Sequence, residues 1–155
     1  IIASNKLYIL PNATPYLFGI LTSGMHMAWM RQVAGRLESR YSYSPAVFHT
    51  FVLPQETTAR RAEIERCAQA VLDERGKHQA SGATLADLYD PVTMPLGLAK
   101  AHAALDRAVD RAYRSAPFET ERARLEYLFS LYQSRTTLFP EKPKKRSRRL
   151  LTKGS

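Results

Sequence analysis

The stretch TPYLFGILTSGMHMAWMRQVAG, residues 14–35, predicts an amphipathic helix. Thr14 can cap its first turn, and Pro15 suits the first helical position because the missing N–H has no partner to lose there. Gly35 is a typical residue just past a helix end. The apolar residues of one helical face are Leu17, Leu21, Met25, Ala28 and Trp29. We therefore expect a helix over about 15–33.

Two glycines interrupt this helix, and two short apolar segments flank it. Gly19 and Gly24 lower helix propensity, so we expect them at points of close packing. KLYIL, residues 6–10, and AVFHTFVLP, residues 46–54, are rich in apolar residues and end at prolines, which predicts strands. Between the helix and the second strand lies the charged and aromatic segment GRLESRYSYSP, residues 35–45.

Four further segments predict helices: 56–77, a single turn at 84–89, 98–113 and 119–133. Apolar residues at helical spacing define one inward face on each of the three longer helices. These faces are Ile64, Cys67, Ala68, Val71 and Leu72; Leu98, Ala101, Leu105, Ala108, Val109 and Ala112; and Leu125, Leu128, Phe129 and Tyr132.

These segments together predict an α+β fold that is mainly α. A small strand–helix–strand piece precedes a C-terminal helical bundle and a disordered basic tail. The apolar run 16–30 is too short and too polar to cross a bilayer. The single cysteine, Cys67, excludes a disulfide framework within the chain. We therefore expect no membrane contact and a reducing, cytoplasmic setting.

The net charge of +9 is concentrated at the C-terminus. Residues 141–155 hold seven Lys or Arg against Glu141, which gives +6, and residues 1–140 hold sixteen against thirteen acids, which gives +3. We expect 140–155 to be disordered because its composition is polar and without periodicity. Such a tail either binds phosphates in a salt-dependent way or only adds solubility, and the sequence favours neither.

Motifs of common enzyme classes are absent from the sequence. It contains no glycine-rich phosphate loop, no G-x-S-x-G and no His-Glu-x-x-His. Asp106 and Asp110 alternate with Arg107 and Arg111, which we interpret as a solvated ion-pair face of a helix. Cys67 lies on a predicted buried face, so we interpret it as a packed thiol.

Two other groups have a structural and a functional interpretation. His26 lies among Met25, Met27 and Trp29, and we interpret it as a satisfied core or interface histidine rather than a cofactor ligand. The turn DLYDP, residues 87–91, carries two carboxylates and a tyrosine. Such residues more often cap helices and stabilise loops than bind ligands.

The charged segment 35–45 has the chemistry needed to contact bases. Arg40 could pair with O6 and N7 of guanine, and Glu38 could accept from N4 of cytosine. Arg31 and Arg36 could hold phosphates, which position a protein on DNA without specifying sequence. On chemistry alone, the simpler interpretation is a surface turn in which Glu38 pairs with an arginine.

Several longer phrases resemble a known family. They are PNAT (11–14), FGILTSGMHMAWMR (18–31), GRLESRYSYS (35–44), SGATLADLYDPVTMP (81–95), AHAALDRAVDRAYR (101–114) and LEYLFSLYQ (125–133). In this order, and over about residues 1–135, they resemble the C-terminal part of the MmeI-like, type IIL restriction–modification proteins. These are large SAM-dependent adenine DNA methyltransferases, some of which are also endonucleases.

The resemblance implies double-stranded DNA as a partner and roles in bacterial defence. It also implies that a methyltransferase domain, and in many members a nuclease, precedes this part. Family members vary at the positions of Glu38 and Arg40, often with Lys and Asp, and this exchange accompanies a change in the recognised base pair. The resemblance therefore implies Glu38 and Arg40 as base contacts. We further expect Arg31, Arg36, Tyr41 and Tyr43 to contact the DNA backbone or groove.

The sequence also departs from the family pattern. Residues 48–54 keep only the phenylalanine and the final proline of the family phrase YNNFPWP. The Asn-Pro-Pro-aromatic tetrapeptide and a glycine-rich SAM site are absent, so this chain has no expected catalytic, cofactor or metal site and is not expected to methylate or cleave by itself. Because it opens at Ile1 without Met, in a strand-like apolar stretch, we expect a piece of a larger protein. The resemblance implies that this larger protein uses S-adenosylmethionine.

The resulting hypothesis divides the chain into the end of a target-recognition domain (1–54), a C-terminal helical domain (55–139) and the tail (140–155). Its predicted role is sequence-specific recognition of duplex DNA. The alternative is a helical docking module that packs against the preceding domains and has only nonspecific affinity for nucleic acid through its tail.

Overall fold

The computed structural model describes residues 8–37 and 40–137 and is mainly helical. Its elements are α1 (Pro15–Thr22), α2 (Gly24–Val33), β1 (Gly35–Leu37), β2 (Arg40–Ser42), α3 (Pro45–Thr50), α4 (Thr58–Gln79), α5 (Leu85–Leu88), α6 (Leu96–Tyr113) and α7 (Glu121–Thr136). The predicted α+β, mainly α class is confirmed. The predicted tail lies outside the described residues.

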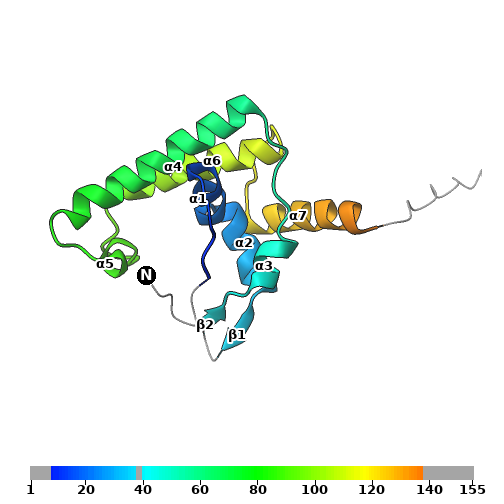
Figure 1. Cartoon of the computed structure of the whole chain (residues 1–155), viewed down its shortest axis with the longest axis horizontal. Coiled ribbons are helices and arrows are strands. Elements are labelled where there is room, and N and C mark those ends of the chain that lie inside the picture. The colour runs from blue at the N-terminus through cyan, green and yellow to red at the C-terminus, as the bar shows by residue number, and fades with distance from the viewer. Residues whose placement is uncertain (1–7, 38–39, 138–155) are drawn as a thin grey trace, which may run out of the picture.

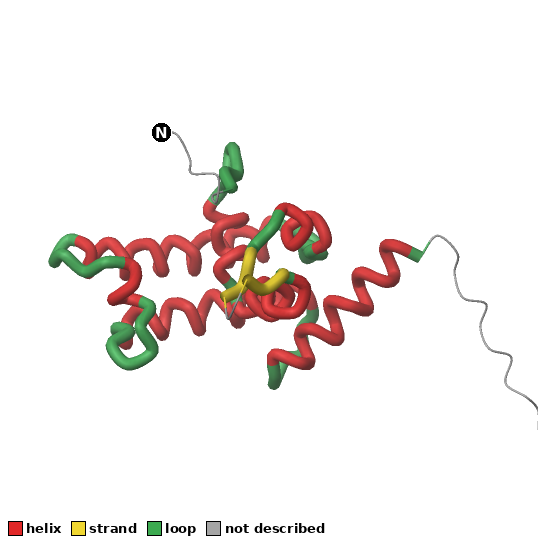
Figure 2. The backbone as a smooth tube through the Cα atoms, turned by 90° about the horizontal axis from the view of Figure 1, so that it is seen from below, coloured by secondary structure: helices red, strands yellow, loops and turns green. Residues whose placement is uncertain are grey.

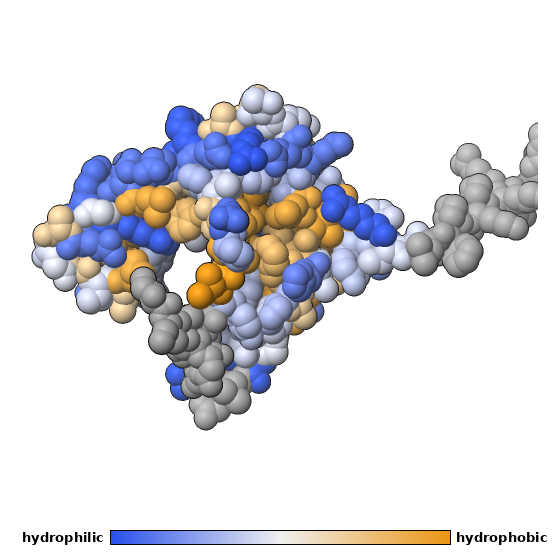
Figure 3. Space-filling view, viewed as in Figure 1, coloured by the Kyte–Doolittle hydropathy of each residue, from blue (hydrophilic) through white to orange (hydrophobic). Residues whose placement is uncertain are grey.

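The long helices α4 and α6 form an antiparallel pair, with the short helix α5 at the end where the chain turns back (Figure 1). Helices α1 and α2 lie beneath this pair, and α7 runs at an angle to it (Figure 2). The two strands pair with each other and project from the side of α2 away from α4. Hydrophilic residues cover the outer side of the long helices, whereas hydrophobic residues gather toward the centre of the same face (Figure 3).

The predicted helix over 15–33 is two helices, because Ser23 interrupts it. Ser23 has extended backbone angles, φ −75° and ψ 157°. Its hydroxyl donates to the carbonyl of Ile20 at 2.7 Å and accepts from the N–H of His26 at 3.4 Å. Ser23 therefore ends α1 and caps α2, as serine does at helix N-termini. The start of α1 is as predicted: Thr14 accepts from an N–H of the first turn and Pro15 follows it.

Both glycines of this region lie at close contacts, as predicted. A Cβ at Gly19 would lie 2.9 Å from Cγ2 of Ile64 and 3.2 Å from Cδ1 of Leu105, so α1 packs directly against α4 and α6. At Gly24, the N–H donates to Oδ1 of Asp106 at 2.7 Å. A carboxylate at a helix N-terminus is stabilising, because it meets unpaired N–H groups and the positive end of the helix dipole.

Asp106 and Asp110 are not a solvated ion-pair face, and that interpretation was wrong. Asp106 binds the N-terminus of α2, and Asp110 is 7% exposed. Both oxygens of Asp110 accept from Arg124 of α7, at 2.9 and 2.7 Å. The periodicity of α6 could not show this, because the partners lie in other helices. This bidentate pair joins α6 to α7.

The predicted strands were also wrong in position. Within residues 6–10, the described part, residues 8–10, is not a strand, and 46–54 contains α3 followed by an extended segment. Pro45 occupies a first-turn position of α3, and Val47 is buried. A short apolar run fits either a strand or a buried helical turn, and here the packing of Val47 decided for the helix.

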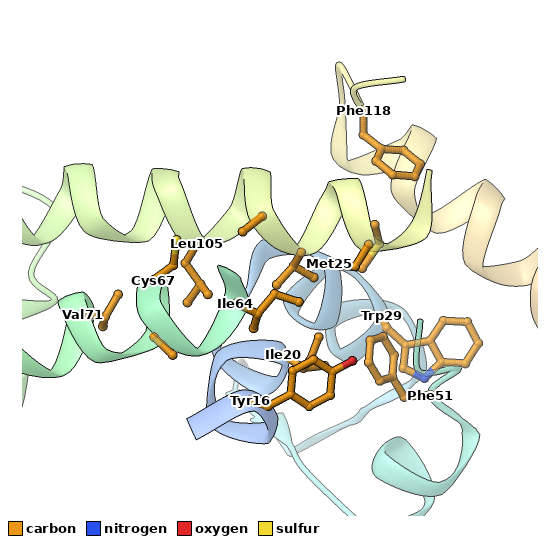
Figure 4. Packing of buried hydrophobic residues seen from close by; sticks show 14 of the residues in the cluster. Tyr16, Ile20, Met25, Trp29, Phe51, Ile64, Cys67, Val71, Leu105 and Phe118 are labelled. Carbon is orange, nitrogen blue, oxygen red and sulfur yellow. The ribbon is translucent and has the colours of Figure 1, made fainter. Parts of the chain in front are cut away.

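The remaining helices agree with the prediction to within a few residues, and their buried faces form one core (Figure 4). Cys67 is 4% exposed and packed in this core, as predicted. Leu72 was predicted inward but is 37% exposed, since it lies at the edge of the α4 face. Asp87 and Asp90 cap the α5 turn and the loop after it, which confirms their structural interpretation. The largest fully buried side chains include Trp29, Ile20, Met25, Ile64, Leu88, Leu98, Leu105, Leu128, Val47, Val71 and Val109.

We predict opposite effects for the same substitution at two helical glycines. Gly19→Ala forces a methyl group against Ile64 and should lower the free energy of unfolding by about 1–3 kcal/mol. In Gly76→Ala on α4, the new methyl group meets no atom within 4 Å. This substitution should raise the free energy of unfolding by about 0.5–1 kcal/mol, because alanine has the higher helix propensity. Urea unfolding of both variants measures the difference, and equal effects would contradict the close contact at Gly19.

A second prediction concerns the pair between α6 and α7. Asp110→Asn leaves the Arg124 guanidinium without its carboxylate in a largely buried place and should lower the free energy of unfolding by about 3 kcal/mol. Glu126→Gln is the matched control, because the Arg122–Glu126 pair on α7 is exposed and should contribute less than about 0.5 kcal/mol. If Asp110→Asn and Glu126→Gln lowered the free energy of unfolding equally, measured by heat or urea, the buried pair would stabilise the fold no more than the exposed one.

Candidate nucleic-acid interface

The charged segment 35–45 contains a β-hairpin. β1 and β2 are antiparallel, with Gly35 opposite Ser42, Arg36 opposite Tyr41 and Leu37 opposite Arg40. Glu38, one of the two predicted base contacts, lies outside the described residues. The hairpin was not predicted, because three-residue strands are too short to show a period of two in the sequence.

Arg36 and Tyr41 form a cross-strand pair on this hairpin. Nη2 of Arg36 donates to the Tyr41 hydroxyl at 3.1 Å, and the guanidinium carbon lies 4.9 Å from the centre of the tyrosine ring. Side chains alternate between the two faces of a strand, so Arg40 belongs to the face opposite Arg36 and Tyr41. All three residues are exposed. The hairpin thus carries one arginine on each face.

Tyr43 connects the end of β2 to the helical body. Its hydroxyl lies 3.0 Å from Nε2 of His26 in α2, at hydrogen-bonding distance. His26 is 3% exposed, and its ring meets Phe51 edge-on with the ring centres 4.6 Å apart. His26 is therefore a core histidine, as predicted, but only one nitrogen is satisfied, because Nδ1 has no partner among the described residues.

Burial sets the protonation of both groups in this pair. It lowers the pKa of His26 from 6.5 to about 4, so the imidazole is neutral at pH 7. It also raises the pKa of Tyr43, which keeps the phenol protonated. The contact is therefore a hydrogen bond between neutral groups and not an ion pair.

Arg31 lies in the last turn of α2 and is engaged with α7. Its Nη1 lies 2.6 Å from Oε2 of Glu121, and both side chains are about half exposed. An exposed pair of this kind is weak in water. If Arg31 contacted a DNA phosphate, the phosphate would replace the Glu121 carboxylate as its partner. Because the Arg31–Glu121 pair is exposed, breaking it costs little free energy.

An apolar hollow of about 600 Å³ lies beside the foot of the hairpin, the end at which Gly35 and Tyr43 join it to the helices. Its walls come from the segment before α1, from α1 and α2, and from Tyr43 and α3. Ile9 and Tyr8 in its wall are 68% and 57% exposed, so part of the apolar wall faces solvent. The lining residues include Ile9, Leu21, Met27, Met30 and Phe48.

A polar cluster that the sequence did not reveal lies at the other end of the molecule. The Tyr89 hydroxyl lies 2.6 Å from Nε of Arg75 and 2.7 Å from Nε2 of His102. The Arg75 guanidinium also faces the rings of Phe18 and Tyr89. These residues come from α1, α4, α6 and the end of α5, so the cluster ties these elements together. No spacing in the sequence brings these positions together.

Within residues 8–37 and 40–137, no group of His, Cys, Asp and Glu is placed to hold a metal ion. No helix in the same part of the chain is long and apolar enough to cross a membrane.

Comparison with known proteins matches two family models that together cover most of the chain. The model of the MmeI target recognition domain matches residues 1–55, and that of the MmeI C-terminal domain matches residues 56–139. The chain belongs to the MmeI family. The family resemblance of its sequence phrases is thereby confirmed.

Two relatives of this family are much longer than the chain. DNA methyltransferase A of Bacillus subtilis (strain 168) is 47% identical over 136 residues, which are 87% of this chain and 15% of the relative. A solved structure of the type IIL restriction–modification enzyme MmeI in complex with DNA is similar with a TM-score of 0.78 and 47% identity, over 83% of this chain and 17% of that one. The chain thus corresponds to about a sixth of each relative.

Burial of His26 predicts that stability falls in mild acid. The unfolded chain takes up a proton near pH 6.5, whereas the folded chain resists it until about pH 4, so the unfolded state binds more protons in this interval. The free energy of unfolding should therefore drop by about 3 kcal/mol more in the wild type than in His26→Gln between pH 7 and pH 4. Urea unfolding at both pH values tests this, with the exposed His49→Gln as control. The same acid response in His26→Gln as in the wild type would contradict burial of a neutral imidazole.

Proposed function

We propose that this chain recognises a short sequence of double-stranded DNA as the C-terminal piece of a larger restriction–modification protein. The observation that carries the proposal is the exposed hairpin with Arg36 and Arg40 on opposite faces, mounted on a helical core. Membership of the MmeI family supports it, because one relative is a DNA methyltransferase and another was solved with DNA.

The geometry of the hairpin suits a DNA groove. The major groove of B-DNA admits a two-stranded β-ribbon, and several proteins use such ribbons for base contacts. We assign Arg40 and Glu38 to the base edges, because arginine pairs with guanine and a carboxylate accepts from cytosine N4. Together the two side chains could recognise both halves of one G·C pair.

The neighbouring residues would position the hairpin. Arg36 and Tyr41 form a preorganised pair on one face, which could meet phosphates on one wall of the groove. Arg31 and Tyr43 lie closer to the body and are assigned to the backbone near the foot of the hairpin. Tyr43 combines this assignment with its bond to His26.

The parent protein is proposed to be an adenine-specific methyltransferase that uses S-adenosylmethionine in a preceding domain. This chain does not fit that cofactor: Gly19, Gly24 and Gly97 face neighbouring side chains within helices, and no glycine-rich loop occurs in the sequence. We therefore derive no methyl-transfer step from this chain. We keep the division into 1–54, 55–139 and 140–155 and a cytoplasmic setting as part of the proposal.

The apolar hollow favours a second candidate function, docking of the preceding part of the larger protein. Apolar side chains line this hollow and remain open to solvent, so another part of a larger protein could pack against them. In that case the hairpin would be a structural element and the chain would have no sequence preference of its own.

The test uses the full-length parent protein and maps the methylated sites on DNA of varied sequence. Glu38→Lys combined with Arg40→Asp reverses donors and acceptors, so we expect one position of the methylated motif to change. The preference at that position should shift by about 10- to 100-fold, which is the discrimination of one bidentate contact.

The matched control reverses an exposed pair away from the hairpin, Arg122→Asp with Glu126→Lys on α7. It should leave the motif unchanged. If the hairpin variant also leaves the motif unchanged and only activity falls, base recognition by this segment is excluded and the docking function is favoured.

A further inference from the structure

The hairpin depends on its foot for its orientation. Each strand has three residues, and β2 is exposed throughout. A two-stranded hairpin of this size is not stable in water without support from the rest of a protein. One strand continues from α2 through Ala34, whose N–H bonds to the carbonyl of Met30 at 2.9 Å. The other strand leaves through Tyr43 toward α3.

The second connection is made by a side chain of the core. His26 belongs to the first turn of α2, held between the Ser23 cap and the ring of Phe51. Its Nε2 lies 3.0 Å from the Tyr43 hydroxyl, seventeen residues along the chain. A buried imidazole has little freedom to move, so it defines where the end of β2 lies relative to α2.

We propose that His26 is a positioning residue for DNA recognition: by its hydrogen bond to Tyr43 it holds the β1–β2 hairpin at the angle at which the hairpin contacts bases. This inference rests on the proposed function of the hairpin. His26 itself is 3% exposed, so its side chain is not placed to contact DNA directly. Its effect on specificity is transmitted through Tyr43.

The unpaired Nδ1 indicates which way the hydrogen bond runs. A buried N–H without an acceptor is rarely found in proteins. The proton therefore belongs on Nε2, which donates to the Tyr43 oxygen, and Nδ1 carries only an unused lone pair. The O–H of Tyr43, a residue 37% exposed, is then available to donate to a phosphate. One hydroxyl thus anchors the hairpin and faces the DNA backbone.

The experiment compares four variants of the full-length parent protein: His26→Phe, Tyr43→Phe, the double variant and His26→Gln. Phenylalanine keeps an aromatic ring at this position but removes both nitrogens. Glutamine can place its amide N–H where Nε2 of His26 lies and so restore the hydrogen bond to Tyr43. His78→Phe is the matched control, because His78 lies in the last turn of α4 and does not line the hollow beside the hairpin. Two quantities are measured: amide hydrogen exchange of residues 35–42 without DNA, and the ratio of methylation at the normal site to that at a site with one changed base pair.

We expect His26→Phe and Tyr43→Phe each to speed exchange of the hairpin amides and to lower the ratio by about fivefold, the factor that corresponds to one neutral hydrogen bond. The double variant should be no worse than either single one, and His26→Gln should restore much of the loss. Thermal stability of His26→Phe at pH 7 should change little, because removal of the unsatisfied Nδ1 offsets the lost hydrogen bond to Tyr43.

The opposite pattern overturns the inference. If His26→Phe lowers thermal stability and weakens action on all sequences while the ratio and the hairpin exchange stay unchanged, His26 is an ordinary core residue. Failure of the proposed function is distinguishable, since it shows as an unchanged motif in the Glu38→Lys/Arg40→Asp variant. Hydrogen exchange without DNA tests the connection between His26 and the hairpin in either case.

Discussion

The N–H of Gly24 donates to the carboxylate of Asp106, and this contact determines the direction of α2. Ser23 ends α1 just before Gly24, so α2 can run in a different direction from α1. The carboxylate of α6 then holds the first turn of α2 against the long helices. The position of the hairpin, which directly follows α2, therefore depends on this contact. A Cβ at Gly24 would lie 3.3 Å from Oδ2 of Asp106, so glycine lets the carboxylate approach the helix end closely.

The helices before the hairpin share one hydrophobic core with the C-terminal helices, although the two family models meet at residues 55 and 56. Ile20 and Met25 of the first segment are buried in the same cluster as Ile64 and Leu105 of the second (Figure 4). Trp29 of α2 packs against Phe129 and Tyr132 of α7, with ring centres 5.1 and 5.9 Å apart. The segment matched by the target recognition domain model is therefore packed against the C-terminal helices.

The candidate site was only partly predictable. Arginines and tyrosines in 35–45 indicated a charged surface segment, because charged side chains are seldom buried without partners. Their pairing across two strands was not predictable, since three-residue strands leave no periodic pattern. Nor was the bond between His26 and Tyr43, because the sequence placed His26 in the core but could not show which residue would meet its Nε2.

The sequence by itself determined the helices α4 to α7, most of their buried faces, the cap at Thr14, and the family. Helical periodicity and capping depend on residues three or four positions apart, so they are written in local sequence. The tertiary structure alone decided the direction that α2 takes after Ser23, that Asp110 is buried against Arg124, and that 46–50 is helical. Each of these depends on a partner from another element, such as α6 for α2 or α7 for Asp110, and local patterns carry no information about that partner.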